Sequence, residues 1–287
     1  MAAKETDPAR PDLEVLAQVA EDYYLKNRTQ SQIAKKLKLS TATVSRLLSR
    51  AREAGVVRIQ IIRPHARHGA LEAALRQNGG LAEVVVVSQP ADLADEDAAR
   101  RYLGRVAAPH LDALIQPGAV VGIGRGRTLA ALAEALHPFA TPRQIQVVQL
   151  LGEYGPQPVP SRTSEITRAM AEAYAGASFY LNAPAQVEDK AVAAALRRAP
   201  GIGEVVAQYD RLDVALVGIG PVRGSPLEAS QLLSAAQLAQ LEAAGAVGEI
   251  CGHYFDAAGR PVDDAYTGCA VGISWEQLRR CPRLVAL

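Results

Sequence analysis

The sequence of 287 residues predicts an α/β protein, with an N-terminal winged helix-turn-helix domain followed by a doubly wound, mostly parallel α/β domain. Three observations predict this class. A compact helix-turn-helix pattern lies within the first 63 residues, and from residue 81 onward apolar strand-like segments alternate with amphipathic helical ones. Hydrophobic residues make up 49% of the chain and aromatic residues only 5%, which suits helices packed on a parallel sheet.

Breaks in the pattern divide the chain into three parts. We assign residues 1–63 to the helix-turn-helix domain, 64–80 to a linker helix and 81–287 to the α/β domain. Arg63-Pro64 ends a strand-like run and sets the first boundary, whereas Gly79-Gly80 ends the linker helix.

Basic residues are concentrated at the N-terminal end. Residues 1–67 carry 13 Lys and Arg against 7 Asp and Glu, a net +6, while the rest carries 18 against 23, a net −5. A basic module on a mildly acidic body indicates that one end binds nucleic acid. The sequence has no apolar run of about 18 residues and no secretory signal, so we expect a cytoplasmic protein without membrane association.

The stretch TQSQIAKKLKLSTATVSRLLS (29–49) predicts the helix-turn-helix, with a further helix over Asp12–Leu25 before it. Thr29 and Gln32 can form a capping box for the first helix of the motif, and Ser40 can cap the second. Apolar residues recur at helical spacing and predict an inward face. These residues are Ile33, Ala34, Leu37, Val44, Leu47, Leu48 and Ala51.

The outward side of the second helix carries side chains suited to the major groove. Thr and Ser can donate to or accept from base edges, and Arg can read guanine through two bonds, whereas Lys suits phosphate contact. A strand over Val56–Ile62 predicts a wing against the phosphates, and Arg28 and Lys38 are further phosphate candidates. Lys38 stands in the turn where many such motifs have Gly. The predicted DNA-binding residues are Lys35, Lys36, Thr41, Thr43, Ser45, Arg46, Ser49 and Arg50.

The α/β domain shows a regular alternation of elements, which predicts a mostly parallel sheet. Its predicted strands are Glu83–Val87, Ala119–Ile123, Ile145–Leu151, Phe179–Leu181 and Val214–Ile219. Its predicted helices are Asp95–Ile115, Leu129–Leu136, Thr163–Ala175, Asp189–Arg198 and Leu227–Ala243.

One glycine-rich turn, GIGRGRTL (122–129), follows a predicted strand and opens a helix. It is neither a dinucleotide fingerprint nor a P-loop, because Arg127 stands where the third glycine of the fingerprint would fall and no Gly-Lys-Ser/Thr follows. The helix N-terminus, Arg127 and Thr128 predict an anion site. The alternative is a turn that is merely tight.

The segments LVGIGPV (216–222), GAVGEICGHYFDAAGRPV (245–262) and VGISWEQLRRCPRLVAL (271–287) resemble the SorC-type sugar-binding transcriptional regulators. The turn GIGRGRTL and the helix-turn-helix also resemble that family. The resemblance implies an effector domain similar to glucosamine-phosphate isomerase, a phosphorylated sugar or polyol as effector, and a tetramer on the operator.

The resemblance also implies the effector-binding residues. The phosphate loop corresponds to Gly124, Arg125, Gly126, Arg127 and Thr128, Asp256 matches a position that contacts sugar hydroxyls, and Gly218 and Gly220 line the same cleft. For Asp256 the alternative is a cap of the turn that follows it. The family continues beyond the strand that corresponds to Leu284–Leu287 into a segment with a phosphate-binding Lys, which we expect this chain to lack.

We therefore expect a regulator of a carbohydrate catabolic operon whose operator affinity is controlled by a small carbohydrate. The expected partners are double-stranded operator DNA, the effector and further copies of the chain in a dimer or tetramer. One alternative is a constitutive oligomeric DNA-binding protein, and another is an enzyme of the sugar-phosphate isomerase or deaminase type. No catalytic residue, metal site or cofactor is predicted, because the five histidines form no acid–base constellation and the three cysteines lack metal-ligand spacing.

Overall fold

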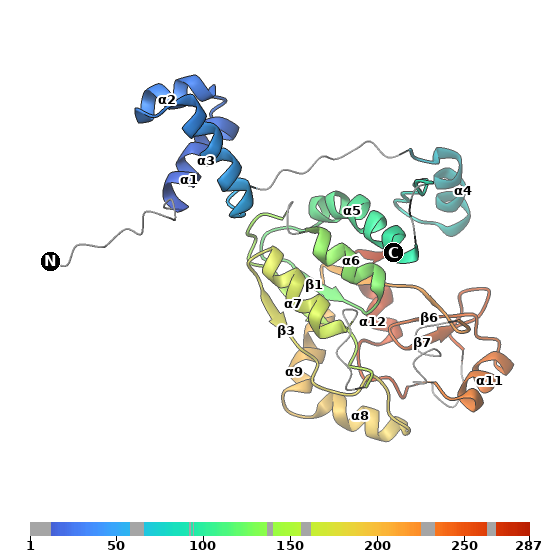
Figure 1. Cartoon of the computed structure of the whole chain (residues 1–287). Coiled ribbons are helices and arrows are strands. Elements are labelled where there is room, and N and C mark those ends of the chain that lie inside the picture. The colour runs from blue at the N-terminus through green and yellow to red at the C-terminus, as the bar shows by residue number, and fades with distance from the viewer. Residues whose placement is uncertain are drawn as a thin grey trace. The chain divides into compact units, whose positions relative to one another are not determined.

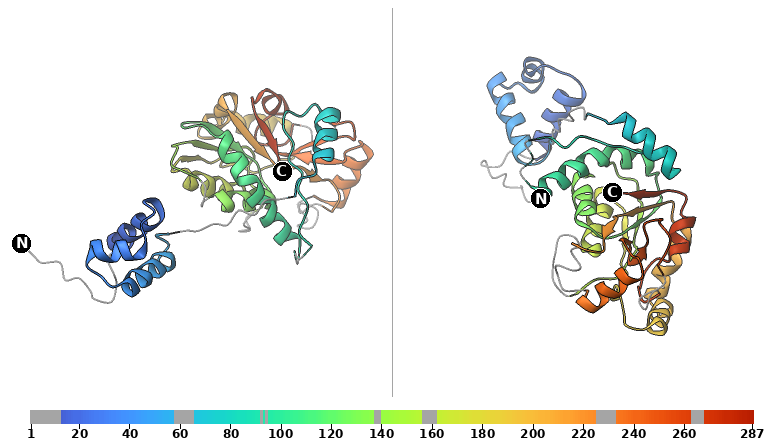
Figure 2. Two further views of the ribbon diagram at one scale, coloured as in Figure 1. Left: turned by 90° about the horizontal axis from the view of Figure 1, so that it is seen from above. Right: turned by 90° about the vertical axis from the view of Figure 1, so that its right-hand side faces the viewer.

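The computed structural model describes residues 13–57, 66–91, 93, 95–136, 140–155, 162–224, 233–262 and 268–287. The chain divides into two compact units, Met1–Pro64 and His65–Leu287, which are drawn in Figures 1 and 2. Among the described residues no helix combines the length and the apolar character that a membrane span requires.

The first unit is a small helical bundle. It contains α1 (Leu13–Ala20), the π-helical turn η1 (Glu21–Leu25), α2 (Gln30–Leu37) and α3 (Thr41–Glu53). The helix expected over residues 12–25 is thus α1 continued by a π-turn. The predicted wing strand lies outside the described residues from Arg58 onward. The inward face of the motif is confirmed, since its core comprises Val19, Ile33, Ala34, Val44 and Leu48, with Leu37 and Leu47 packed against them.

A five-stranded parallel sheet forms the centre of the second unit, and four of its strands overlap strands that the sequence predicted. Its order is β3-β2-β1-β4-β8, and each neighbouring pair is parallel. The strands are β1 (Val120–Ile123), β2 (Gln146–Gln149), β3 (Ala177–Phe179), β4 (Val214–Val217) and β8 (Leu284–Ala286). From β1 the chain moves outward to β2 and β3 and then returns to β4 on the other side of β1.

Apolar side chains leave the central strands on both faces, so the sheet is doubly wound. Val121 of β1 belongs to a core with α5 (Glu96–Leu114), α6 (Arg127–Leu136) and α7 (Thr163–Ala173), which lie together in Figure 1. Val120 belongs to the opposite core, which includes residues of α9 (Ile202–Val206), η2 (Ala207–Arg211) and α12 (Trp275–Arg280). Figure 2 shows this layering from two further sides.

The remaining helices agree with their predicted bounds to different extents. Helix α4 (Gly69–Gly79) corresponds to the predicted linker helix, and Gly80 follows it in the left-handed conformation. Helix α8 (Lys190–Arg198) agrees with its prediction. Helix α11 (Ala235–Ala243) begins after the cap Ser234, and residues 227–232 of the longer predicted helix lie outside the described residues.

The strand predicted over Glu83–Val87 is wrong. Val87 forms only an isolated antiparallel bridge with Arg67. The Glu72 carboxylate of α4 accepts hydrogen bonds from the Val86 N–H at 2.9 Å and from Arg67 at 2.8 Å. The backbone of this segment is therefore bonded to α4 and to the residues before α4, and it does not pair with the sheet.

The second unit also contains a small antiparallel sheet that was not predicted from the sequence. Its strands are β5 (Gly220–Pro221), β6 (Gly248–Ile250) and β7 (His253–Phe255), in the order β5-β6-β7. Two or three residues are too few to show the alternation by which a strand is recognised.

Candidate DNA-binding surface and effector site

Two polar caps fix the ends of the helices in the helix-turn-helix. The Gln32 N–H donates to the Thr29 hydroxyl at 3.3 Å, and the Thr29 N–H donates to the Gln32 side chain at 2.9 Å. The Thr43 N–H donates to the Ser40 hydroxyl at 3.0 Å. Both predicted caps are therefore confirmed, and they set where α2 and α3 begin.

The turn between α2 and α3 contains a strained residue. Lys38 ends α2 in the left-handed conformation, with φ 56°, and its side chain is exposed. A residue with a Cβ atom adopts this conformation at an energetic cost that Gly does not have. This is the position at which the sequence departs from the usual glycine of such motifs.

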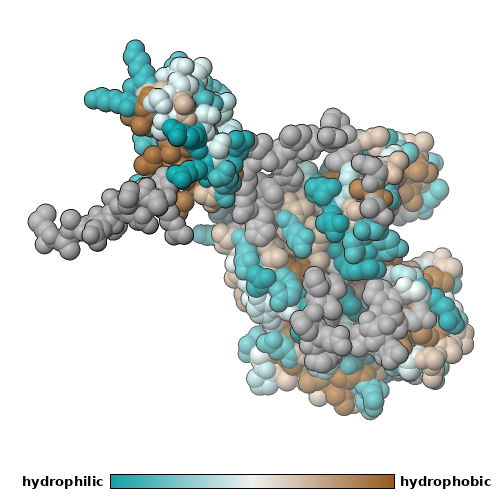
Figure 3. Space-filling view, in the orientation of Figure 1, coloured by the Kyte–Doolittle hydropathy of each residue, from teal (hydrophilic) through white to brown (hydrophobic). Residues whose placement is uncertain are grey.

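The predicted DNA-binding residues of α3 share its outward side. Val44 and Leu48 are buried in the bundle, which leaves the opposite side to the polar side chains. Thr41, Ser45, Arg46 and Arg50 are exposed, and Thr43 and Ser49 are half-buried. On α2 both Lys35 and Lys36 are exposed, and Lys36 also contacts the carboxylate of Asp22 at 2.6 Å. Figure 3 shows the polar surface of this unit beside apolar patches.

In the second unit, two glycines meet at the point where the strand order reverses. Gly124 follows β1 and Gly218 follows β4, its neighbour in the sheet. The Gly124 N–H donates to the Leu216 carbonyl at 2.8 Å, and a Cβ atom on Gly218 would lie 3.2 Å from the Arg125 carbonyl oxygen. Doubly wound sheets bind their ligands outside the carboxyl ends of the strands at this switch point.

Arg125 extends from this point over an aromatic ring. Its guanidinium carbon lies 4.7 Å from the ring centroid of Tyr154, which follows β2. Within the described residues, the Arg125 Nη1 and the Tyr154 hydroxyl are buried without a hydrogen-bond partner. Burial raises the pKa of the Tyr154 hydroxyl, and the nearby Glu249 carboxylate raises it further.

The carboxylate of Glu249, on β6, lies near the same switch-point residues. A Cβ atom on Gly220 would lie 3.2 Å from its Oε1, and its Oε2 accepts the Gly252 N–H at 3.0 Å. Burial raises the pKa of Glu249, while the bond from Gly252 and the charge of Arg125 act in the opposite direction. The structure thus brings Gly124, Arg125, Gly218 and Gly220 together with Tyr154 and Glu249, two residues that the sequence analysis did not select.

A tight hairpin turn lies beside the switch-point residues, whereas Asp256 lies away from this turn. Cys251 and Gly252, both with positive φ, connect β6 to β7, and the Cys251 Sγ would lie 3.1 Å from a Cβ atom on Gly124. Asp256 lies at the other end of the hairpin. Its Oδ1 accepts the N–H groups of Ala258 and Arg260, both at 2.9 Å, which are the contacts of a turn cap.

The N-terminus of α6 presents its first N–H groups just beyond Gly126. The Gly126 carbonyl accepts the Ala130 N–H at 3.0 Å, so the N–H groups of Arg127 and Thr128 precede the first helical bond. The Arg127 guanidinium lies 4.0 Å from Glu96 and 3.9 Å from Asp97 in the first turn of α5. The cation that was predicted to bind an anion is therefore already close to two carboxylates.

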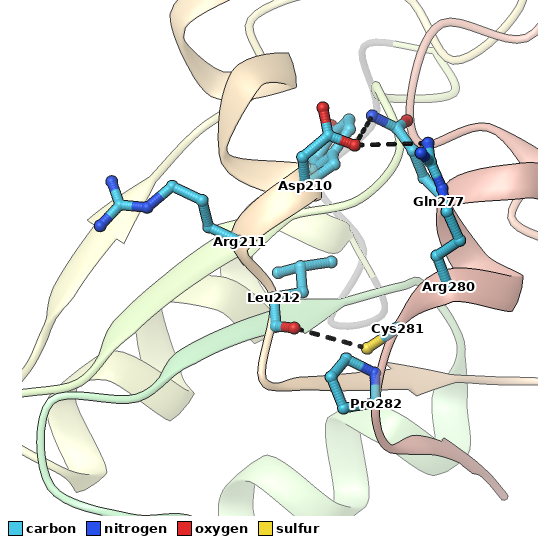
Figure 4. Close-up of a pocket in the computed structure, with 8 residues that line it drawn as sticks. Asp210, Arg211, Leu212, Gln277, Arg280, Cys281 and Pro282 are labelled. Carbon is cyan, nitrogen blue, oxygen red and sulfur yellow. Dashed lines mark hydrogen bonds and ion pairs between the residues drawn. The ribbon is translucent and has the colours of Figure 1, made fainter.

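A separate cavity of about 310 Å³ lies at the opposite edge of the sheet. Leu212, just before β4, and Pro282, just before β8, contribute to its wall (Figure 4). Asp210 accepts a hydrogen bond from Gln277 at 3.1 Å and lies 3.5 Å from Arg280. None of the predicted effector-binding residues lines this cavity.

The histidines and cysteines of the described residues were further candidates for chemistry. No group of three His, Cys, Asp or Glu side chains there has the arrangement of a metal site. His253 contacts the Ile273 carbonyl at 2.7 Å, and His68 contacts the Ser88 hydroxyl at 2.7 Å. Burial raises the pKa of the Cys251 thiol, which makes it a poor nucleophile at neutral pH.

Comparison with known families matches both units. Residues 64–287 match the family described as "Putative sugar-binding domain", and residues 16–54 match the family described as "Sigma-70, region 4".

Similar proteins cover nearly the whole chain. The sorbitol operon regulator of Klebsiella pneumoniae is 30% identical over 273 residues, 94% of this chain and 85% of the relative. The transcriptional regulator LsrR of Enterobacter sp. (strain 638) is 31% identical over 278 residues, 96% of this chain and 82% of the relative. The crystal structure of the full-length sorbitol operon regulator SorC from Klebsiella pneumoniae has a TM-score of 0.72 at 29% identity, covering 96% of this chain and 88% of that one.

Proposed function

The chain belongs to the SorC family of sugar-binding transcriptional regulators, and from this premise we propose which residues bind its DNA and its effector. It is a DNA-binding transcriptional regulator under the control of a carbohydrate effector. In the proposal, residues 1–63 bind operator DNA, 64–80 link the parts, and 81–287 bind a phosphorylated sugar or polyol. We propose that the protein acts in the cytoplasm. We also propose that the genes it controls form a carbohydrate catabolic operon.

The proposed effector site rests on one observation at the switch point. The Arg125 Nη1 and the Tyr154 hydroxyl are buried there without hydrogen-bond partners among the described residues. A buried donor without a partner destabilises a folded protein by about 1–3 kcal/mol, so such groups are rare unless a ligand uses them. In the proposal, a sugar hydroxyl accepts from Arg125 Nη1 and another contacts the Tyr154 hydroxyl. The Glu249 carboxylate accepts from a third hydroxyl, which its position beside Arg125 allows.

The phosphate of the effector is assigned to the N-terminus of α6. The N–H groups of Arg127 and Thr128, the Thr128 hydroxyl and the helix dipole all favour an anion there. Glu96 and Asp97 compete for the Arg127 side chain, which is 48% exposed and therefore able to turn toward a phosphate. Gly124 and Gly126 allow the ligand to approach the backbone. Asp256, at the far end of the hairpin, remains a weaker candidate for contact with the sugar.

On the DNA side, α3 is assigned to the major groove. Arg46, Ser45 and Thr43 are proposed to read base edges together with Thr41, Ser49 and Arg50, and Lys35 and Lys36 to contact phosphates. One helix-turn-helix reads only a few base pairs, so we propose a dimer or tetramer on two half-sites.

Exposed apolar side chains are available for such an assembly. They include Leu13 and Leu25 in the first unit and Leu71 and Leu75 of α4 in the second. Figure 3 shows the apolar surface on α4. A strictly monomeric chain in light scattering, with and without operator DNA, would contradict the assembly.

The α/β unit is proposed to bind its ligand rather than convert it. The groups around the switch point are an arginine, a phenol with a raised pKa, a partly buried carboxylate and a thiol whose pKa is also raised. These groups can hold a polyhydroxy compound, but the thiol and the phenol are poorly ionised at neutral pH. Turnover of a sugar phosphate by the purified chain would contradict this part of the proposal.

A thermal-shift screen of sugar and polyol phosphates against their unphosphorylated parents tests the effector site. A ligand at about 100 times its Kd adds roughly 2.7 kcal/mol to the stability of the folded state. We expect the phosphorylated compound to stabilise the chain more than its parent, and Arg125→Met and Arg127→Met to reduce the shift. Stabilisation by parents alone, or shifts untouched by Arg127→Met, would exclude the α6 N-terminus as the phosphate site.

A further inference from the structure

One carboxylate in the DNA-binding unit is fully buried and surrounded by cations. Asp22, in the π-turn η1, has a side chain that is 0% exposed. The Lys36 Nζ lies 2.6 Å from its Oδ2, and the Arg28 Nη1 lies 2.8 Å from its Oδ1. The Lys26 Nζ lies 3.3 Å from the same Oδ1. Lys26 and Arg28 follow η1, and Lys36 belongs to α2.

We propose that Asp22 is a positioning residue for DNA binding, which holds Arg28 and Lys36 as a fixed pair of phosphate contacts. Long basic side chains lose rotamer freedom when they bind, and a cation that is already held loses less. The inference rests on the assignment of residues 1–63 to DNA.

The two cations keep donors for a second partner. Arg has five N–H donors and Lys has three, and each uses one on Asp22. Their side chains remain 40% and 42% exposed. Lys26 differs, because it also lies 3.5 Å from Glu21 and is thus shared between two carboxylates. Arg28 and Lys36 are therefore the cations with charge and donors to offer to a phosphate.

The π-turn explains why the carboxylate lies there. Its wider turn is closed by the Lys26 N–H, which donates to the Glu21 carbonyl at 3.0 Å. The Arg28 N–H donates to the Asp22 carbonyl at 2.9 Å, so the backbone folds back and places Arg28 beside the carboxylate. The π-turn η1 follows α1 directly and ends this helical segment, and π-turns are uncommon and often found at functional positions.

Charge and position predict opposite results for Asp22→Asn. If only charge counted, removing a negative group from a DNA-binding surface would strengthen binding. If Asp22 positions the cations, the substitution weakens binding and lowers the salt dependence, because each phosphate contact adds about 0.9 to the slope of log K against log salt. Glu21→Gln is the matched control, because it removes the same charge from the neighbouring residue. The Glu21 side chain is 56% exposed.

The experiment measures binding of the full-length chain to a short mixed-sequence duplex by fluorescence anisotropy at several salt concentrations. We expect Asp22→Asn to weaken binding at least about fivefold and to lower the slope by about 1 to 2, and Glu21→Gln to leave both unchanged or bind slightly tighter. Binding by Asp22→Asn that equals the wild type, with an equal slope, overturns the inference. No binding by the wild type would instead contradict the DNA-binding assignment.

Circular dichroism establishes whether Asp22→Asn stays folded. If it does not, Arg28→Met and Lys36→Met, which keep Asp22 and two of its three cations, decide the matter. Each is expected to lower the slope by about 1. Unchanged slopes in both variants overturn the inference.

Discussion

The guanidinium of Arg125 lies 4.7 Å above the ring of Tyr154, and the buried polar atoms of both residues have no hydrogen-bond partner in the described part of the chain. The contact joins the carboxyl ends of β1 and β2 at the edge of the sheet that doubly wound folds use for ligands.

This arrangement predicts that Tyr154→Phe lowers effector affinity without lowering stability. Removing a buried hydroxyl that has no partner is expected to leave the free energy of unfolding unchanged or to raise it by up to about 1 kcal/mol. Effector affinity should fall by roughly 2- to 12-fold, the worth of one hydrogen bond. Thermal unfolding and calorimetric titration measure the two quantities.

Tyr209→Phe is the matched control, because the Tyr209 hydroxyl donates to the Gln149 carbonyl at 2.8 Å. It should destabilise the fold by about 1–2 kcal/mol and leave the effector affinity unchanged. Equal loss of stability in both variants would mean that Tyr154 has a structural partner.

The strained turn predicts a gain in stability from Lys38→Gly. Gly adopts the observed φ of 56° without the cost of a Cβ atom, so the first unit should gain about 0.5–1 kcal/mol. Binding to all DNA should weaken slightly, because a cation is lost. Lys38→Ala keeps the strain and loses the same charge, so it should weaken DNA binding without the gain in stability. Equal melting temperatures for the two variants would contradict this.

Base reading and phosphate contact predict different responses at two exposed residues. Arg46→Ala should cost about 1–3 kcal/mol of operator affinity and relax the choice of sequence, because a base contact is lost. Lys35→Ala should weaken operator and mixed-sequence DNA by the same factor. Competition binding at fixed salt separates them, and a uniform effect of Arg46→Ala would remove it from the base-reading set.

The cations around Asp22 predict acid lability of the first unit. The hydrogen bond from Lys36 is the largest cause that lowers the pKa of Asp22, against the opposing effect of burial. Because the folded state then binds fewer protons than the unfolded state, this contribution to stability is present above the unfolded pKa of about 4 and is lost as the pH falls through the lower folded value. Melting temperatures of the wild type should therefore fall more steeply below about pH 4 than those of Asp22→Asn. Parallel curves would exclude Asp22 as the cause.

What the sequence foretold correctly depends on neighbours along the chain. The caps at Thr29 and Ser40 involve partners three residues away, and the strand at β1 carries its own apolar pattern. What it missed depends on residues far apart. Tyr154 and Glu249 become visible as site residues only when β2 and the β6–β7 hairpin are folded against Arg125.

Long-range contacts also explain why segment 83–87 is not a strand and why the role of Asp22 was not predicted. The segment 83–87 has the apolar character of a strand, but Glu72 of α4 takes its backbone N–H at Val86. Asp22 reads in the sequence as one acid on a helix, and only the fold brings Lys36, fourteen residues later, onto it.

We propose that a carbohydrate bound at the β1–β4 switch point changes the affinity of the regulator for its operator. Fluorescence anisotropy with labelled operator DNA tests it, using the wild type and Arg125→Met with and without the compound that stabilises the wild type most. We expect the compound to change the operator Kd of the wild type by about 5- to 150-fold, the usual range of coupling between two sites. We expect Arg125→Met to bind the operator with the same affinity as the unliganded wild type and not to respond to the compound. A wild-type Kd that stays constant at saturating compound, or an Arg125→Met variant that responds like the wild type, would contradict the claim.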